Sequence, residues 1–126
     1  MLSTSVYSQT SSEQKIIAAY GENWYNTEKI ENPGQITILS KYVEYGFKVM
    51  DVSDAKFADQ PQINQIPLRS KGAASLSVQD FLNLYSQPDF NPLLLGYFPT
   101  EKAQLIKLAN VSKVIYIESL ENLLNK

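Results

Sequence analysis

The chain contains no cysteine and no histidine, so neither disulfide bonds nor a zinc ion bound by these residues can hold its fold together. Stability must therefore come from a packed apolar core. The composition provides for one, because 44% of the residues are hydrophobic and 19% are charged, as in folded globular proteins. With 126 residues, the chain has the length of one domain with a single core.

The same two absences remove several classes of chemistry. The chain cannot build a Ser-His-Asp or Cys-His nucleophile or a histidine-bound haem. Its 11 lysines and arginines face 13 aspartates and glutamates, and Arg69 is the single arginine, so a nucleic-acid partner is not expected. The longest apolar run, 92–98, is far shorter than the roughly 20 residues of a membrane-spanning helix. We expect no cofactor, no metal ion and no membrane span.

The beginning of the chain is small and polar, and we expect a disordered N-terminus at residues 1–12 before a single domain at residues 13–126. Val6 and Ser8 lie three and one positions before Gln9, which is the spacing that signal peptidase recognises. The segment is therefore either the remnant of a signal peptide, cleaved between Ser8 and Gln9, or a disordered tail without further meaning. Both interpretations remain open.

Two segments in the first half have helical patterns. The first, 13–31, follows a capping box that begins at Ser11 and is weakest at Gly21. The second begins at Asn32-Pro33, which supplies a cap residue and a proline at the first helical position. It ends at Gly46, where we expect a left-handed glycine.

A third helix, 78–85, lies between the cap residue Ser77 and Pro88, and one or two helical turns at 119–125 end the chain. The expected buried stripes of the three main helices are Ile16, Ile17, Tyr20 and Trp24; Ile36, Leu39, Tyr42 and Val43; and Val78, Phe81, Leu82 and Tyr85.

Strands are expected at 47–52, 104–109 and 113–118, where β-branched and aromatic residues gather. The last two flank a turn at Asn110 and form a hairpin. A helix over 100–108, capped by Thr100, is the competing interpretation.

In the remaining segments the hydrophobic residues do not recur at a helical or strand spacing. Prolines and polar residues interrupt 53–75, although Ile63, Ile66 and Leu68 suit a short extended piece. The apolar segment 90–99 is expected to be a buried loop beneath the sheet. The fold class is therefore α+β, with about three helices packed on one face of a small antiparallel sheet of roughly three strands.

Without histidine, acid–base chemistry would depend on carboxylates, lysine or tyrosine. The densest carboxylate group is Asp51, Asp54 and Asp59, which begins at the end of a strand and enters a long loop. Its spacing does not match a calcium-binding loop. Aspartate is also a routine turn residue, so the simpler interpretation is a set of solvated turn formers.

Three residues are the candidate binding residues. Glu22 and Tyr25 belong to an aromatic and polar segment, and Tyr25 lies about 100° around the helix from Trp24, which places it toward the surface. Arg69 precedes Lys71 in a glycine-containing loop that can bind an anion, although the loop lacks the strand and helix of a phosphate-binding motif. The alternatives are core packing and a solvated loop.

The chain resembles the small uncharacterised exported proteins of Gram-negative bacteria. The resemblance is carried by the Val6-Tyr7-Ser8-Gln9 junction, the size of the chain and the Asn32-Pro33 helix start. It implies a periplasmic or secreted location. It implies no activity and identifies no site residue.

Three functions follow as hypotheses. The first is a non-enzymatic exported binding or accessory module for a protein partner, because no catalytic constellation is evident and the chain has eight tyrosines, a residue favoured at interfaces. The second is a small enzyme that uses Asp51, Asp54 or Asp59. The third is a carrier of a small ligand, with 90–99 as a pocket wall. The sequence does not indicate an oligomeric state.

Overall fold

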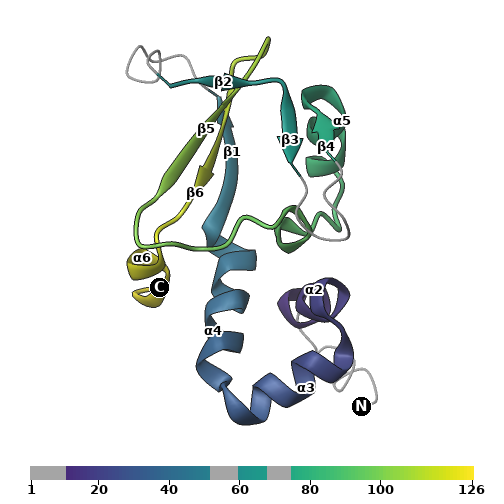
Figure 1. Ribbon diagram of the computed structural model, residues 1–126, viewed down its shortest axis with the longest axis vertical. Helices are drawn as coiled ribbons and strands as arrows, with labels where there is room; N and C mark the ends of the chain where they lie inside the picture. The colour runs from purple at the N-terminus through teal and green to yellow at the C-terminus, as the bar shows by residue number, and fades with distance from the viewer. Residues whose placement is uncertain (1–10, 52–59, 68–74) are drawn as a thin grey trace.

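The computed structural model describes residues 11–51, 60–67 and 75–126 (Figure 1). Over these residues the chain forms five α-helices, a mixed sheet of four strands and a separate sheet of two strands. The predicted α+β class is confirmed. The numbers of helices and strands differ from the prediction, and the larger sheet is not purely antiparallel.

The first predicted helix is two helices, α2 (Ser11–Tyr20) and α3 (Glu22–Glu31). Gly21 separates them with a φ of 99°, a left-handed value that glycine adopts without the steric cost of a side chain. Its amide donates to the carbonyl of Ile17 at 2.7 Å, and its own carbonyl accepts from the amide of Tyr25 at 3.1 Å. The expectation of one continuous helix over 13–31 is therefore wrong.

The next helix, α4 (Pro33–Lys41), begins after Asn32 as predicted, and a π-helical turn (Tyr42–Gly46) extends it to β1 (Phe47–Asp51). Gly46 is not left-handed, contrary to the prediction. The structure requires glycine at this position for a different reason: a Cβ atom there would overlap the ring of Tyr42.

The four-stranded sheet has the order β1-β6-β5-β2. β5 (Gln104–Leu108) and β6 (Lys113–Ile117) form the predicted antiparallel hairpin, so the alternative helix over 100–108 is wrong. β6 also pairs antiparallel with β1, and β2 (Gln62–Ile63) pairs parallel with β5. The parallel pair was not expected, because the sequence pattern does not show which strand a two-residue segment joins.

The two-stranded sheet pairs β3 (Gln65–Pro67) antiparallel with β4 (Ser75–Ser77). α5 (Val78–Tyr85) follows β4 directly. The Ser77 hydroxyl accepts a hydrogen bond from the amide of Asp80 at 3.1 Å, which confirms the predicted cap. The chain crosses from the larger sheet to the smaller one at Asn64, the residue between β2 and β3.

The segment 90–99 contains a 3₁₀ helix (Pro92–Leu95) and is mostly buried, as predicted. Phe98 is the exception, with 41% of its surface exposed. The chain then forms the hairpin and ends in α6 (Leu120–Leu124), which Ser119 caps by accepting from the amide of Asn122 at 3.2 Å.

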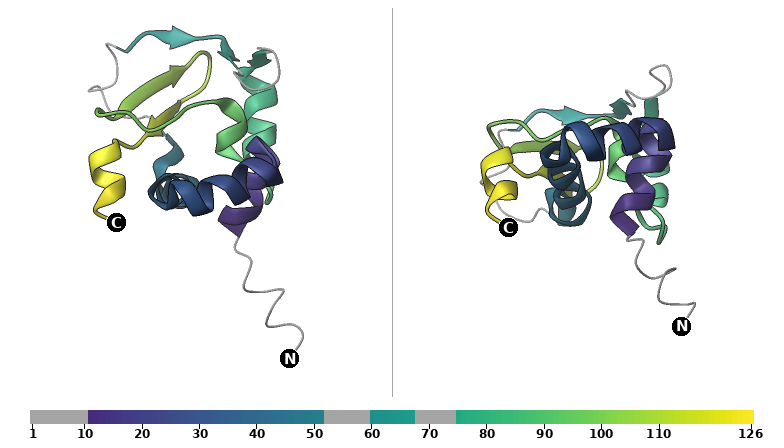
Figure 2. Two further views of the ribbon diagram at one scale, coloured as in Figure 1. Left: turned by 60° about the horizontal axis from the view of Figure 1, so that its bottom comes forward. Right: turned by 90° about the horizontal axis from the view of Figure 1, so that it is seen from below.

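One core joins the helices to both sheets. Figure 1 shows α4 leading into β1, so that α2, α3 and α4 lie beyond that end of the sheet, and both views in Figure 2 place α5 and α6 on opposite sides. The largest fully buried side chains are Tyr42, Phe81, Ile16, Leu39, Ile66, Leu93, Leu95, Leu108, Ile115, Ile117, Leu123 and Val114. Because these come from seven α-helices and strands and from the π-helical and 3₁₀ turns, no single segment carries the core.

Candidate functional site

The structure describes two of the three predicted binding residues, Glu22 and Tyr25, both on α3. Glu22 lies exposed in the first turn of α3. Tyr25 is only 6% exposed, so the expectation that it faces solvent is wrong. The break at Gly21 changes the direction of α3, and a helical wheel drawn through 13–31 therefore assigns the wrong face to this residue. Arg69 lies outside the residues that the structure describes.

Tyr25 connects the first two helices. Burial raises the pKa of its hydroxyl, and the carboxylate of Glu13, to which the hydroxyl is hydrogen-bonded, raises that pKa further. Lys29 lies over the same ring, with its ammonium nitrogen 5.8 Å from the ring centroid. These contacts make Tyr25 a packing residue between α2 and α3.

The neighbouring aromatic residues form a surface instead. We define the aromatic surface as Tyr20, Trp24 and Phe98, which come from α2, α3 and the end of the 90–99 segment. The ring centroids of Tyr20 and Trp24 are 4.7 Å apart, and those of Tyr20 and Phe98 are 6.1 Å apart. Tyr20 and Trp24 are half-buried against the core, so one side of each ring packs inward.

Burial raises the pKa of the Tyr20 hydroxyl from its ordinary value of 10.0 to about 12, so the hydroxyl stays uncharged well above neutral pH. The aromatic surface therefore consists of three rings without charge. The sequence analysis favoured core packing for Tyr20 and Trp24 and did not single out Phe98. The sequence feature that could have indicated an exposed Phe98 is its position directly before Pro99, at the end of the buried segment.

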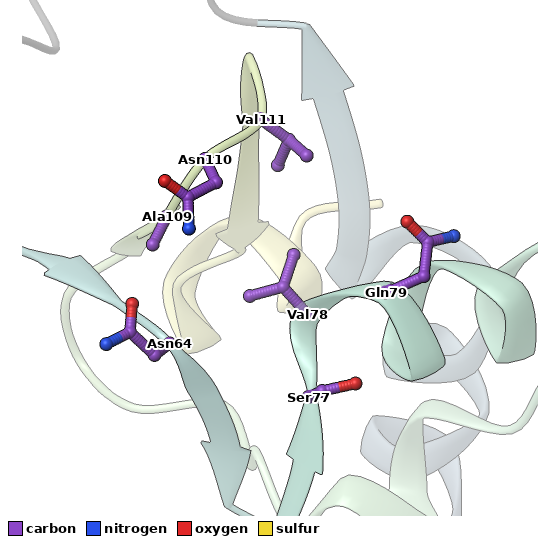
Figure 3. A pocket seen from close by; sticks show the side chains of 7 residues that line it. All are labelled: Asn64, Ser77, Val78, Gln79, Ala109, Asn110 and Val111. Carbon is purple, nitrogen blue, oxygen red and sulfur yellow. The ribbon is translucent and has the colours of Figure 1, made fainter.

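A hollow of about 320 Å³ lies where the chain crosses between the two sheets (Figure 3). We call it the junction hollow. Asn64, Gln79 and Asn110 place carboxamides around it, and Val78, Ala109 and Val111 supply apolar surface. Each residue is placed by a local feature: Asn64 by the crossing, Gln79 by the first turn of α5, and Asn110 by a left-handed turn conformation with φ of 66°.

Two further hollows lie elsewhere. One, of about 410 Å³, lies between α2 and the segment that follows α5, and Asn91 and Leu94 line it. The 90–99 segment therefore does form part of a hollow wall, as the carrier hypothesis requires. The other, of about 520 Å³, lies at α6, where Glu101 and Glu121 flank two leucines.

The predicted carboxylate group is described only at Asp51; Asp54 and Asp59 fall in a range that the structure does not describe. The side chain of Asp51 is exposed at the end of β1, and its Oδ1 lies 2.6 Å from Nζ of Lys113 on the paired strand. Within the described ranges, no group of three acidic side chains is suited to hold a metal ion.

The sequence analysis missed Glu118, a carboxylate that is only 7% exposed. It follows β6 and precedes the cap residue Ser119. Its Oε1 accepts hydrogen bonds from the Tyr116 hydroxyl at 2.7 Å, the Asn122 side chain at 2.9 Å and the Ser119 amide at 3.0 Å. The available signal was an acidic residue at the end of an apolar strand, next to a helix cap.

The pKa of Glu118 reflects these bonds. Burial alone would raise the pKa of the carboxyl, but the hydrogen bonds from Asn122, Tyr116 and the Ser119 amide, together with the charge of Lys126, hold it below its ordinary value. Glu118 is therefore ionised at neutral pH and fixes the end of β6 to the start of α6, which is a structural role.

No protein-family model, curated protein or solved structure matches this chain. In the ranges that the structure describes, none of the helices combines the length and apolar character that crossing a membrane requires.

Proposed function

We propose that the protein is an exported, non-enzymatic binding module that recognises a protein partner through the aromatic surface. The observation that carries this proposal is the exposure of Phe98 beside two further aromatic rings that are partly buried. Tyrosine, tryptophan and phenylalanine are enriched at protein interfaces, because they bury a large area with little loss of side-chain freedom.

The position of the rings supports this assignment. Phe98 directly follows a buried tyrosine, and the Tyr20 and Trp24 rings pack inward on one side, so the aromatic surface rests on the core and is held in place before a partner arrives. Rings that are already ordered lose little further entropy on binding. Anchors of this kind dominate the affinity of many interfaces.

Trp24 is the only tryptophan in the chain, so its fluorescence reports on the aromatic surface alone. A partner recovered by affinity chromatography from an envelope extract is expected to shift the emission of Trp24 to shorter wavelength as the ring is covered. Phe98→Ala is expected to weaken the affinity at least about tenfold, the effect of an interface anchor. Titration with the partner measures both the emission shift of Trp24 and the affinity.

Leu84→Ala is the matched control, because Leu84 on α5 is exposed to nearly the same extent, 43%. This control should leave the affinity unchanged, and circular dichroism should show that both variants are folded. Recovery of no partner, or equal loss of affinity in both variants, would contradict the proposal.

The exported location rests on the Val6-Tyr7-Ser8-Gln9 junction. Because α2 begins at Ser11, cleavage between Ser8 and Gln9 would leave every described helix and strand intact. We expect the protein isolated from its native cell to begin at Gln9, as determined by N-terminal sequencing. Val6→Arg, which places a large charged side chain at the recognised position, should block this processing. An unprocessed protein retained in the cytoplasm would refute the export proposal.

A further inference from the structure

We propose that the junction hollow binds a small uncharged ligand that carries both an amide and a methyl group, of the kind found in an N-acetylated monosaccharide. This site lies apart from the aromatic surface, since the two share no residue, and its occupation does not depend on the proposed protein partner.

The walls of the hollow are fixed before a ligand binds. The Ala109 amide donates to the Ile63 carbonyl at 2.9 Å, which holds the crossing segment against the hairpin. Gln65 is in register with Ser77, which holds the same segment against β4. Asn64 lies between these two attachments. Small-molecule sites are usually formed in this way by the scaffold rather than by the ligand.

The hollow offers hydrogen bonds that the described part of the chain leaves unused. Asn64 and Asn110 are exposed, and neither side chain has a hydrogen-bond partner among the residues that the structure describes. Gln79 donates from its Nε2 to Asn83 at 3.2 Å, which leaves its Oε1 able to accept. Each carboxamide provides both donors and acceptors, so the set suits a ligand with hydroxyl and amide groups.

The described lining favours an uncharged ligand. Among the residues that the structure describes, none of those lining the hollow has an ionisable side chain, so a charged group would lose hydration without gaining an opposite charge from them. Val78 and Ala109 are buried, and with Val111 they offer apolar surface between the carboxamides (Figure 3). A methyl group covers such a surface, while an amide next to it reaches the carboxamides.

The volume limits the ligand to about one sugar ring. A hollow of about 320 Å³ lies at the lower end of the range of small-molecule sites, which begins near 300 Å³. The first amides of α5 add donors on one side, because a helix leaves its initial amides without partners in the helix and Ser77 accepts only from Asp80. An N-acetyl carbonyl or a ring hydroxyl can accept from them.

Nuclear magnetic resonance tests the proposal directly, since the side-chain amide signals of asparagine and glutamine are visible in a nitrogen–proton correlation spectrum. Titration with N-acetylglucosamine is expected to shift the signals of Asn64, Gln79 and Asn110 with a dissociation constant in the millimolar range, as expected for one sugar-sized ligand. Glucose, which lacks the N-acetyl group, should bind at least about tenfold more weakly.

Asn110→Gly is the informative variant, because glycine accepts the φ of 66° and the change removes only the carboxamide. It should weaken binding at least about tenfold. Asn26→Ala, an exposed asparagine on α3, is the control and should bind as the unaltered protein does.

Three results would overturn the proposal: no shift with N-acetylglucosamine, equal binding of glucose, or shifts at these signals with inorganic phosphate, which would indicate an anion site at the α5 N-terminus. The readout does not involve Trp24, so failure here leaves the proposed protein partner untouched, and failure of the partner experiment leaves this site untouched.

Discussion

Gly46→Ala is expected to lower the free energy of unfolding by about 2 kcal/mol, within the range that overpacking of a core costs. The added Cβ would overlap Cδ1 of Tyr42 and lie 3.0 Å from its Cε1. Tyr42 is fully buried, in a turn that contacts α2, α4 and α6, so its ring cannot shift without disturbing the core. Urea-induced unfolding, followed by circular dichroism, measures the change.

Gly34→Ala provides the matched control. Gly34 lies in the first turn of α4, and a Cβ atom there would meet nothing within 4 Å. Alanine at such a position restricts the unfolded chain and is expected to stabilise the protein by about 0.5 kcal/mol. The double variant Gly46→Ala with Tyr42→Leu should lose less unfolding free energy than the two single variants lose together, because the smaller side chain relieves the overlap. Equal effects at the two glycines would contradict this account.

Glu118→Ala is expected to destabilise the protein by about 3 kcal/mol at pH 7, the upper range for hydrogen bonds to a charged group. The change leaves the Ser119 amide and the Asn122 side chain without the acceptor that joins β6 to α6. Glu121→Gln, a substitution at an exposed position in α6, should change stability by less than about 0.5 kcal/mol.

The contribution of Glu118 also depends on pH. Its pKa in the folded state lies below the ordinary value of 4.5, so its stabilising effect is fully present above pH 4.5 and is lost as the pH falls through the lower, folded-state pKa. Glu118→Gln cannot titrate. The difference in unfolding free energy between the unaltered protein and this variant should therefore shrink below pH 4.5. A difference that stays constant with pH would show that the carboxylate charge is not responsible.

Local patterns were sufficient to predict several elements. α5 needed only its cap residue Ser77 and apolar positions spaced three and four residues apart, and both features lie within nine residues of sequence. The β5–β6 hairpin followed from two β-branched runs around Asn110. Such elements are defined by neighbours in the chain, so a single sequence contains what is needed to find them.

Other features depend on contacts between distant residues. The parallel pairing of Ile63 with Leu108 joins two segments 45 positions apart, and no local pattern specifies it. The orientation of Tyr25 changes with the backbone of one glycine, Gly21. The junction hollow combines a strand crossing, a helix start and a hairpin turn, so it exists only once the chain has folded.

The position of β6 has a consequence for synthesis. β6 is the last strand in the chain but lies between β1 and β5, the two strands that flank it in space. A nascent chain that has left the ribosome only as far as Ser112 carries both neighbours and lacks the strand that joins them. The sheet closes only after Ile117 emerges, so the edges of β1 and β5 that later pair with β6 remain open to chaperones, or to aggregation, until that point.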